Sequence, residues 1–421
     1  MILPWGVARA HGPFPRTTQI LFDPTDPDVL FVPSTFGILV SKDGGGTWDW
    51  ICFETMDFAV DDAVNPEFEV MENGDLLSVG RTGLWRGQDL GCQWDQPDDV
   101  LANTYLIDLL PRRGDKAEAL ILTSSSLISN FISQTEDNGE TWTTLGQPLG
   151  KVLFESIGAS GADPVHLHLS STIPGGTEPR SAEMYRSTDG GLSFEKVSTR
   201  EMERGYVLRI LATSPEARDL LFVAEQSIFT SEVRQLLRSD DGGKNFTEVA
   251  TFAGRFVEEV VFETGDRVWV VGVGGTGLWL STDRGASFDP VNRDVDASCL
   301  QFRGDELWVC GNQYLDGFGV GRSLDGGKTF DPVFRFDDIR GPLSCENGEP
   351  IAKTCEQAYL DLQSDLSLPE QSGVTPEPMT ATRSNGGSCS AAPTAFGRKG
   401  GWQFPCLGIL AVFVWSFRRR V

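Results

Sequence analysis

A glycine-rich run, SKDGGGTWDW at residues 41–50, contains the residue types of a ligand loop, a phosphate-binding loop or a tight turn. A phosphate loop needs a Lys-Ser/Thr pair followed by a helix, and this run has neither. An aspartate carboxylate can instead accept hydrogen bonds from N–H groups of its own turn. Glycines permit positive φ, and a tryptophan can anchor a turn between sheets. We therefore interpret Asp43, Gly44 to Gly46 and Trp48 as a structural turn.

The same pattern recurs along the chain as S/T/G-x-D-x-G-x-x-W/F, and we call it the turn motif. Its other copies begin near residues 87, 135, 187, 239, 281 and 323, so that successive aspartates are 42 to 52 residues apart. The seven motif aspartates, all with a predicted structural role, are Asp43, Asp89, Asp137, Asp189, Asp241, Asp283 and Asp325.

This period is the length of a propeller blade, which consists of four short strands and their turns. In the first unit, TQILFDP, VLFVPST, GILVSKD and TWDWICFE predict four strands, and the fifth unit repeats the scheme. A single sheet would leave an apolar face in water, whereas a ring of sheets buries both faces. The sequence thus predicts an all-β, seven-bladed β-propeller over residues 16–340.

Each unit contains its own four strands, so no strand from a chain end is expected to complete a blade. We expect ring closure by packing between sheet faces, helped by a disulfide-looped segment at 341–360.

The motifs resemble the Asp-box, or BNR, repeats of sialidase-like propellers, and FDPTDPDVLFV is similar to the sortilin and xyloglucanase branch. Sialidases of that family use an arginine triad, a Tyr/Glu pair and an F/Y-R-I-P motif before the first box. Here that region reads PRTTQILFDP, so the expected motif is missing. Arg81 and Arg322 are interpreted as packing or turn-bracing residues, and we assign no catalytic residue.

His166 and His168 alternate in VHLHLS, a spacing that could place two imidazoles beside one metal ion. With no third ligand nearby in the sequence, ordinary surface or core histidines are the preferred interpretation. We predict no metal and no cofactor. A carboxylate pair for glycoside hydrolysis stays open, because its separation in space cannot be read from a sequence.

Eight cysteines are present, and the first six fall into three pairs in sequence order. On proximity alone we expect Cys52 with Cys92, Cys299 with Cys310 and Cys345 with Cys355, although six cysteines allow 15 connectivities. Disulfides would indicate an oxidising compartment.

The formal net charge of −25 argues against nucleic-acid binding, which needs a basic face. Acidity of this size keeps a protein soluble, and cationic partners or calcium stay possible.

Both ends of the chain indicate export. Residues 1–15 are interpreted as the remnant of a signal peptide, because ARA before His11 has the pattern of a cleavage site, and an unstructured amino terminus is the alternative. Residues 361–385 are rich in Pro, Ser, Thr and Glu and predict a flexible linker. Residues 386–421 contain Cys389, a 16-residue apolar stretch and a final Arg cluster, which predict a sorting and membrane-anchor segment with a short hydrophobic helix.

This last segment resembles the myxobacterial carboxy-terminal sorting domain, and the resemblance implies that Cys389 is the processed and lipid-bearing residue. A plain short membrane anchor is the alternative. Both interpretations place the propeller outside the cytoplasm, at the cell envelope, outer membrane or cell surface.

The sequence therefore predicts an exported, monomeric, membrane-anchored propeller that binds a protein or glycan through loops and the central cavity of one face, without catalysis. The first alternative is an exo-sialidase-like glycoside hydrolase, and the second is an envelope assembly or scaffolding factor.

Overall fold

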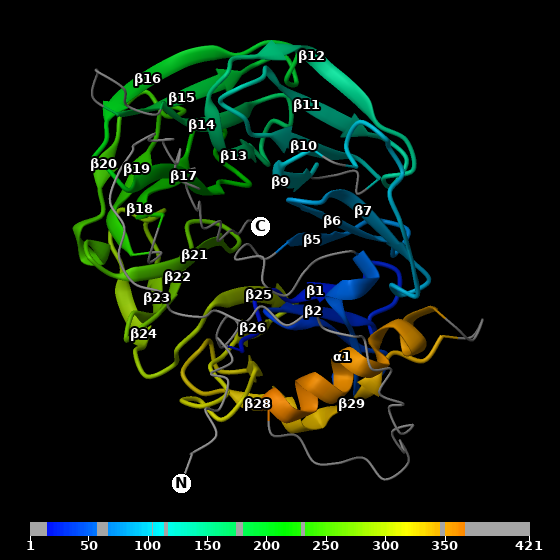
Figure 1. Cartoon of the computed structure of the whole chain (residues 1–421). Coiled ribbons are helices and arrows are strands. Elements are labelled where there is room, and N and C mark those ends of the chain that lie inside the picture. The colour runs from blue at the N-terminus through cyan, green and yellow to red at the C-terminus, as the bar shows by residue number, and fades with distance from the viewer. Residues whose placement is uncertain are drawn as a thin grey trace, which may run out of the picture. The chain divides into compact units, whose positions relative to one another are not determined.

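Seven sheets follow one another around a ring, and in each of them a turn motif joins the third and fourth strands (Figure 1). The computed structural model describes residues 15–56, 66–102, 104–112, 117–173, 180–228, 232–345 and 350–366, all within one compact unit. The predicted seven-bladed propeller is confirmed. The predicted signal remnant lies almost entirely outside the described residues, and the predicted anchor segment, with Cys389, lies entirely outside them.

The bounds of the strands in the first four blades are as follows. Blade 1 contains β1 (Leu21–Phe22), β2 (Leu30–Ser34), β3 (Gly37–Ser41) and β4 (Trp48–Ile51), and blade 2 contains β5 (Glu67–Val70), β6 (Leu76–Gly80), β7 (Gly83–Gln88) and β8 (Gln93–Asp95). Blade 3 contains β9 (Leu106–Pro111), β10 (Ala119–Thr123), β11 (Asn130–Thr135) and β12 (Thr143–Leu149), and blade 4 contains β13 (Leu153–Ala159), β14 (Leu167–Ile173), β15 (Ser181–Ser187) and β16 (Glu195–Glu201).

The remaining blades repeat this order. Blade 5 contains β17 (Tyr206–Thr213), β18 (Leu221–Ser227), β19 (Val233–Ser239) and β20 (Thr247–Glu248), and blade 6 contains β21 (Phe256–Phe262), β22 (Val268–Val273), β23 (Gly277–Ser281) and β24 (Asp289–Asn292). Blade 7 contains β25 (Cys299–Arg303), β26 (Glu306–Cys310), β27 (Val320–Ser323) and β28 (Asp331–Phe334). Three short 3₁₀ helices, at Phe53–Met56, Ala250–Phe252 and Phe336–Asp338, lie in connections.

Because neighbouring strands are antiparallel, the connections alternate between two faces of the ring. The box face carries the turn motifs and the connections between the first and second strands of each blade. The loop face carries the connections between the second and third strands and those between blades. These two names are used below.

In six blades the motif aspartate is held by one repeated set of bonds. The Ser or Thr two residues before the aspartate donates its hydroxyl to the carboxylate (2.7–2.9 Å). The same hydroxyl oxygen accepts the N–H of the glycine two residues after the aspartate (2.7–2.9 Å). The residue four positions after the aspartate donates its N–H (2.8–3.0 Å) and its side-chain hydroxyl or amide (2.5–2.7 Å). Hydrogen bonds from Ser287 and Ser281 lower the pKa of Asp283 to about 2.

The blade 2 motif, GQDLGCQW, departs from this arrangement. Asp89 has a φ of 51°, and its backbone carbonyl accepts the N–H of Cys92 at 3.0 Å. The motif begins with a glycine where the others have Ser or Thr, so the hydroxyl that organises the other six turns is absent at this position.

The ring closes differently from our expectation. Blades 1 and 7 do keep their own four strands, but a further strand, β29 (Ile339–Pro342), pairs in parallel with β4 on the outer edge of blade 1. Arg340 on this strand makes a bidentate ion pair with Asp49 of β4, at 2.9 Å. The segment after blade 7 therefore extends the blade 1 sheet in addition to any packing between faces.

A 17-residue helix, α1 (Pro350–Leu366), follows β29 and was not predicted. Its buried side chains are Ile351, Cys355, Tyr359 and Leu362, at spacings of four, four and three residues. The Tyr359 ring lies 5.9 Å from that of Trp50, and its hydroxyl donates to the Ile339 carbonyl. The helix continues six residues into the range 361–385 that we assigned to the linker.

Two of the three expected disulfide pairs are wrong. Cys299–Cys310 forms as expected, but Cys52 pairs with Cys355 and Cys92 with Cys345. The reason is the return of the chain along blade 1, which places residues after blade 7 beside the end of β4 and beside the blade 2 motif. We call residues 339–345 and 350–366 the clasp, because they connect blade 7 to blades 1 and 2 through β29 and two disulfides.

Among the described residues, no helix is long and apolar enough to cross a membrane.

Candidate functional site

Polar side chains on the first strands of the blades, or just before the first strand in blade 1, form hydrogen bonds with the next blade. These strands lie nearest the centre of the ring (Figure 1). The bonds run from the backbone N–H of Phe68 to Gln19 (3.2 Å), of Leu109 to Glu67 (3.0 Å), of Ile157 to Asp108 (2.6 Å), of Ile210 to Ser156 (2.8 Å) and of Leu300 to Glu259 (2.8 Å). Each of the three carboxylates thus has an oxygen bonded to a backbone N–H of the next blade, an arrangement that ties neighbouring blades together.

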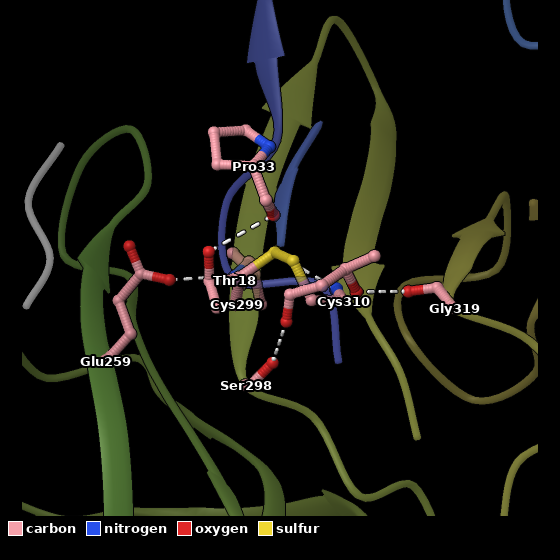
Figure 2. The surroundings of a disulfide bond; sticks show 9 residues. Thr18, Pro33, Glu259, Ser298, Cys299, Cys310 and Gly319 are labelled. Carbon is pink, nitrogen blue, oxygen red and sulfur yellow. Dashed lines mark hydrogen bonds between the residues drawn. A yellow bond between two sulfur atoms is a disulfide. The ribbon is translucent and has the colours of Figure 1, made fainter. Parts of the chain in front are cut away.

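The junction between blades 7 and 1 uses hydroxyl groups. Ser298 donates to the Thr17 carbonyl at 2.9 Å, and Thr17 donates to the Gly319 carbonyl at 2.6 Å. Figure 2 shows the neighbouring Cys299–Cys310 disulfide, with Glu259 of blade 6 on one side and Pro33 of blade 1 on another. The innermost polar groups at this junction therefore also serve contact between blades.

Further charges are buried near the centre. Glu155 and Arg209 are 3% and 2% exposed, and Arg16 lies 3.6 Å from Glu258. Burial lowers the pKa of Arg180, while the Glu155 carboxylate opposes this shift and the charge of Arg204 adds to it. Acidic and basic groups are therefore mixed here, and buried charges of this kind need compensation from their partners.

The two arginines singled out from the sequence lie in blades 2 and 7, on either side of blade 1. Arg81 is exposed in the β6–β7 turn of blade 2. Arg322 lies on β27 of blade 7, with Nη1 at 3.4 Å from Glu306 and the guanidinium over the Trp308 ring. The Arg322 guanidinium is therefore engaged by residues of its own blade.

The two histidines have different surroundings. His166 precedes β14, and its Nδ1 lies 2.9 Å from a carboxylate oxygen of Asp163. His168 lies on β14 and is 1% exposed, against Gly242 of the blade 5 motif. In the described ranges, no three His, Cys, Asp or Glu side chains are grouped as a metal site.

We expect His168 to make the fold sensitive to weak acid. Burial lowers its pKa from 6.5 to about 4, although Asp219 opposes the shift. Below pH 6.5, His168 is protonated in the unfolded chain but stays neutral in the folded chain until about pH 4. Its contribution to the free energy of unfolding is therefore complete above pH 6.5 and decreases as the pH falls to about 4. The free energy of unfolding should drop by about 2 kcal/mol between pH 7 and pH 5 from this residue.

Urea unfolding at several pH values measures this effect. In His168→Gln, the free energy of unfolding should no longer fall between pH 6.5 and pH 4. In His166→Gln, it should still fall over this range. An unchanged slope in His168→Gln would show that other groups cause the pH dependence.

Large apolar side chains are exposed mainly on the loop face. Of the eight with high exposure among the described residues, five lie in its connections: Val100, Leu127, Ile128, Tyr314 and Leu315. The other three, Val165, Leu192 and Leu324, lie on the box face. Val100 and Leu127 lie in connections that touch, because Ser124 donates its N–H to the Tyr105 carbonyl.

The box face has a small cavity of about 180 Å³ between blades 5 and 6. Leu220 and Phe262 are among its lining residues, together with Glu216, Asp266 and Arg284. The charged groups are engaged: Arg284 donates to Asp266 at 2.7 Å, and Glu216 accepts the N–H of Gly265 at 2.9 Å. This cavity therefore lacks free charged groups that converge on a ligand.

No protein-family model matches the chain. It is 24% identical to sortilin of Danio rerio over 277 residues, which are 63% of this chain and 28% of sortilin. The chain thus spans under a third of that relative.

Several solved structures are similar. A GH74 xyloglucanase from Xanthomonas campestris has a TM-score of 0.45 and 18% identity, covering 74% of this chain and 59% of the enzyme. YCF48 bound to a D1 peptide has a TM-score of 0.43 and 17% identity, covering 61% and 78%. The β-propeller domain of the Trilobed protease from Pyrococcus furiosus has a TM-score of 0.47 and 10% identity, covering 79% and 99%.

These similarities do not assign an activity or a ligand. Disulfides are typical of extracellular or secretory-pathway proteins, and the described residues form three. On this evidence the chain is a disulfide-bonded seven-bladed β-propeller with partial similarity to sortilin.

Proposed function

We propose that this propeller is a non-catalytic binding module that holds a protein ligand on its loop face, outside the cytoplasm. The observation that carries the proposal is the concentration of exposed large apolar side chains there, five of the eight in the described part of the chain. Contiguous exposed apolar patches are typical of interaction sites, whereas scattered single residues are normal. On the loop face, the connections that carry Val100 and Leu127 touch, and Tyr314 and Leu315 are adjacent in the sequence.

The polar groups near the centre support binding better than hydrolysis. A glycosidase needs one carboxyl group as an acid and a second as a base or nucleophile, at a defined separation. Asp108 and Glu259 are fully buried, and each accepts a backbone N–H of the next blade. Removing either carboxylate from this bond would leave a buried donor unsatisfied, so we assign both a structural role.

A protein ligand fits the chemistry of the loop face better than a glycan. Four of its five exposed large apolar side chains are aliphatic, namely Val100, Leu127, Ile128 and Leu315. Aliphatic side chains release water when they are covered by another apolar surface, whereas a hydroxyl-rich sugar offers little of it.

Site-specific photo-crosslinking in producing cells tests the proposal. The full chain would carry p-benzoylphenylalanine in place of Leu127 on the loop face or of Leu324 on the box face. We expect one discrete, identifiable protein adduct from position 127 and none from position 324. Adducts from 324 alone, or from neither position, would contradict the proposal.

Enzyme and glycan alternatives have their own readouts. Release of fluorophore from a fluorogenic sialoside by the purified full chain would favour hydrolysis. Selective binding on a glycan array without a protein adduct would favour a glycan ligand.

A further inference from the structure

One exposed loop is unusually well fixed. Residues 311–319, which we call the Tyr314 loop, connect β26 to β27 on the loop face of blade 7. At its tip Tyr314 and Leu315 are 57% and 73% exposed. Large apolar side chains that project into water cost solvation free energy unless a partner covers them.

Hydrogen bonds within the loop fix its backbone. Asn312 donates its N–H to Asp316 at 2.7 Å, and its side-chain oxygen accepts the N–H of Tyr314 at 3.1 Å. The Asn312 carbonyl accepts the N–H groups of Leu315 (3.0 Å) and Asp316 (2.7 Å). Tyr314 and Leu315 therefore lie in a turn whose backbone is held by hydrogen bonds between Asn312 and Asp316.

The loop is also tied to the adjoining connection between blades 6 and 7. Asp296 donates its N–H to the Asp316 carboxylate (3.2 Å) and accepts the side-chain amide of Asn312 (2.9 Å). A second oxygen of Asp296 accepts the N–H of Gly274 at 2.6 Å. Two acidic residues and one asparagine are thus used to hold the loop rather than to bind a ligand.

An aromatic row continues from the loop toward blade 1. The Tyr314 ring lies 6.1 Å from that of Phe336, which lies 5.4 Å from that of Phe36. Gln313 accepts the N–H of Phe336, and Arg335 donates to the Gly317 carbonyl. One side of the Tyr314 ring therefore rests on protein while more than half of the side chain is open to solvent.

The surroundings of this tip are acidic. Five aspartates lie on the loop or in the two connections beside it, namely Asp294, Asp296, Asp316, Asp337 and Asp338. The same segments contain two basic residues, Arg293 and Arg335, and Arg293 lies 4.6 Å over the Trp279 ring. This excess of acid agrees in sign with the net charge of the whole chain, −25.

We propose that Tyr314 and Leu315 form a preformed anchor that inserts into an apolar cleft of a protein partner whose rim carries Lys or Arg. A rigid aromatic side chain on a fixed loop loses little conformational entropy on binding, which is the property of interface hot spots. The excess of negative charge around the tip favours a partner with a basic rim and speeds the encounter. This inference rests on the proposed function and specifies where on the loop face the partner is held.

Affinity measurements on the full chain test the anchor. The probe is the purified protein identified by crosslinking from position 127. Tyr314→Ala and Leu315→Ala should each weaken its binding at least tenfold, whereas Leu324→Ala, an equally exposed leucine on the box face, should leave it unchanged. Because all three side chains are exposed, the variants should unfold at the same temperature as the parent chain.

Two further readouts separate the anchor from its alternatives. Asp337→Lys should slow association and reduce the dependence of affinity on salt. p-Benzoylphenylalanine in place of Leu315 should give the same adduct as at position 127.

An adduct from 127 without one from 315, or unchanged affinity in both alanine variants, would overturn the anchor and leave the binding function standing. The absence of an adduct from both positions would overturn both proposals.

Discussion

Replacing the four cysteines of the two disulfides that join the clasp to blades 1 and 2 with alanine is expected to cause the largest loss of stability in this chain. The clasp disulfides close loops of 303 and 253 residues, from Cys52 to Cys355 and from Cys92 to Cys345. In the chain-entropy model, a single cross-link over such a loop restricts the unfolded chain by about 5–6 kcal/mol. The second cross-link adds less, because the first already shortens the loop.

The third disulfide provides a matched control. Cys299 and Cys310 face each other on β25 and β26 across 11 residues, for which the same model gives about 3 kcal/mol. Removing it should therefore cost less than half of what removal of both clasp disulfides costs.

Chemical unfolding followed by far-ultraviolet circular dichroism would compare the four-alanine variant, the Cys299→Ala/Cys310→Ala variant and the parent chain. Equal losses in the two variants would mean that the clasp contributes little beyond an ordinary local cross-link. Release of the clasp alone, with the blades intact, would appear as a separate early transition.

Trp48→Ala is expected to have the second largest effect, about 3–5 kcal/mol, as for other buried tryptophans. Trp48 ends the blade 1 motif and is fully buried. Its Nε1 donates to the carbonyls of Gly45 (3.1 Å) and Val333 (3.3 Å), and its ring lies 5.2 Å from that of Phe334. The substitution would leave a cavity where blade 7 meets blade 1, beside the clasp.

The same motif position in blade 3 provides the comparison. Trp142 makes the equivalent bond to Gly139 at 3.1 Å but is only partly buried. Trp142→Ala should lose less than half as much free energy of unfolding as Trp48→Ala, measured by the same denaturant titration. Similar losses would show that the motif bond, rather than burial at the ring closure, sets the cost.

The number and spacing of the blades could be predicted from the turn motif, because the hydrogen bonds of this motif are local in the sequence. Asp283, for example, bonds to residues two positions before it and four positions after it, so every partner is visible in one short window. The sequence pattern that we used did not include the residue four positions after the aspartate, which bonds to the carboxylate. Ser, Thr or Asn occupies this position in all six regular motifs. Helix α1 was also overlooked, although Ile351, Cys355 and Tyr359 follow a helical spacing.

The candidate binding surface was only partly predictable. Loops of one propeller face were expected to hold the ligand, and the loop face follows from strand order. The Tyr314 loop did not stand out, because no pattern in its sequence says that Tyr314 is exposed while Phe336 beside it is buried. The expected role of a central cavity was not supported by the innermost carboxylates, whose backbone bonds depend on the neighbouring blade.

By itself, therefore, the sequence determined the number of blades and their four-strand plan, since local turn bonds and strand periodicity depend on neighbours in the chain. Only the tertiary structure decided that β29 extends blade 1, which cysteines pair across 303 and 253 residues, and which apolar side chains remain uncovered. These features depend on which distant segments meet when the ring closes, and proximity along the chain does not predict that.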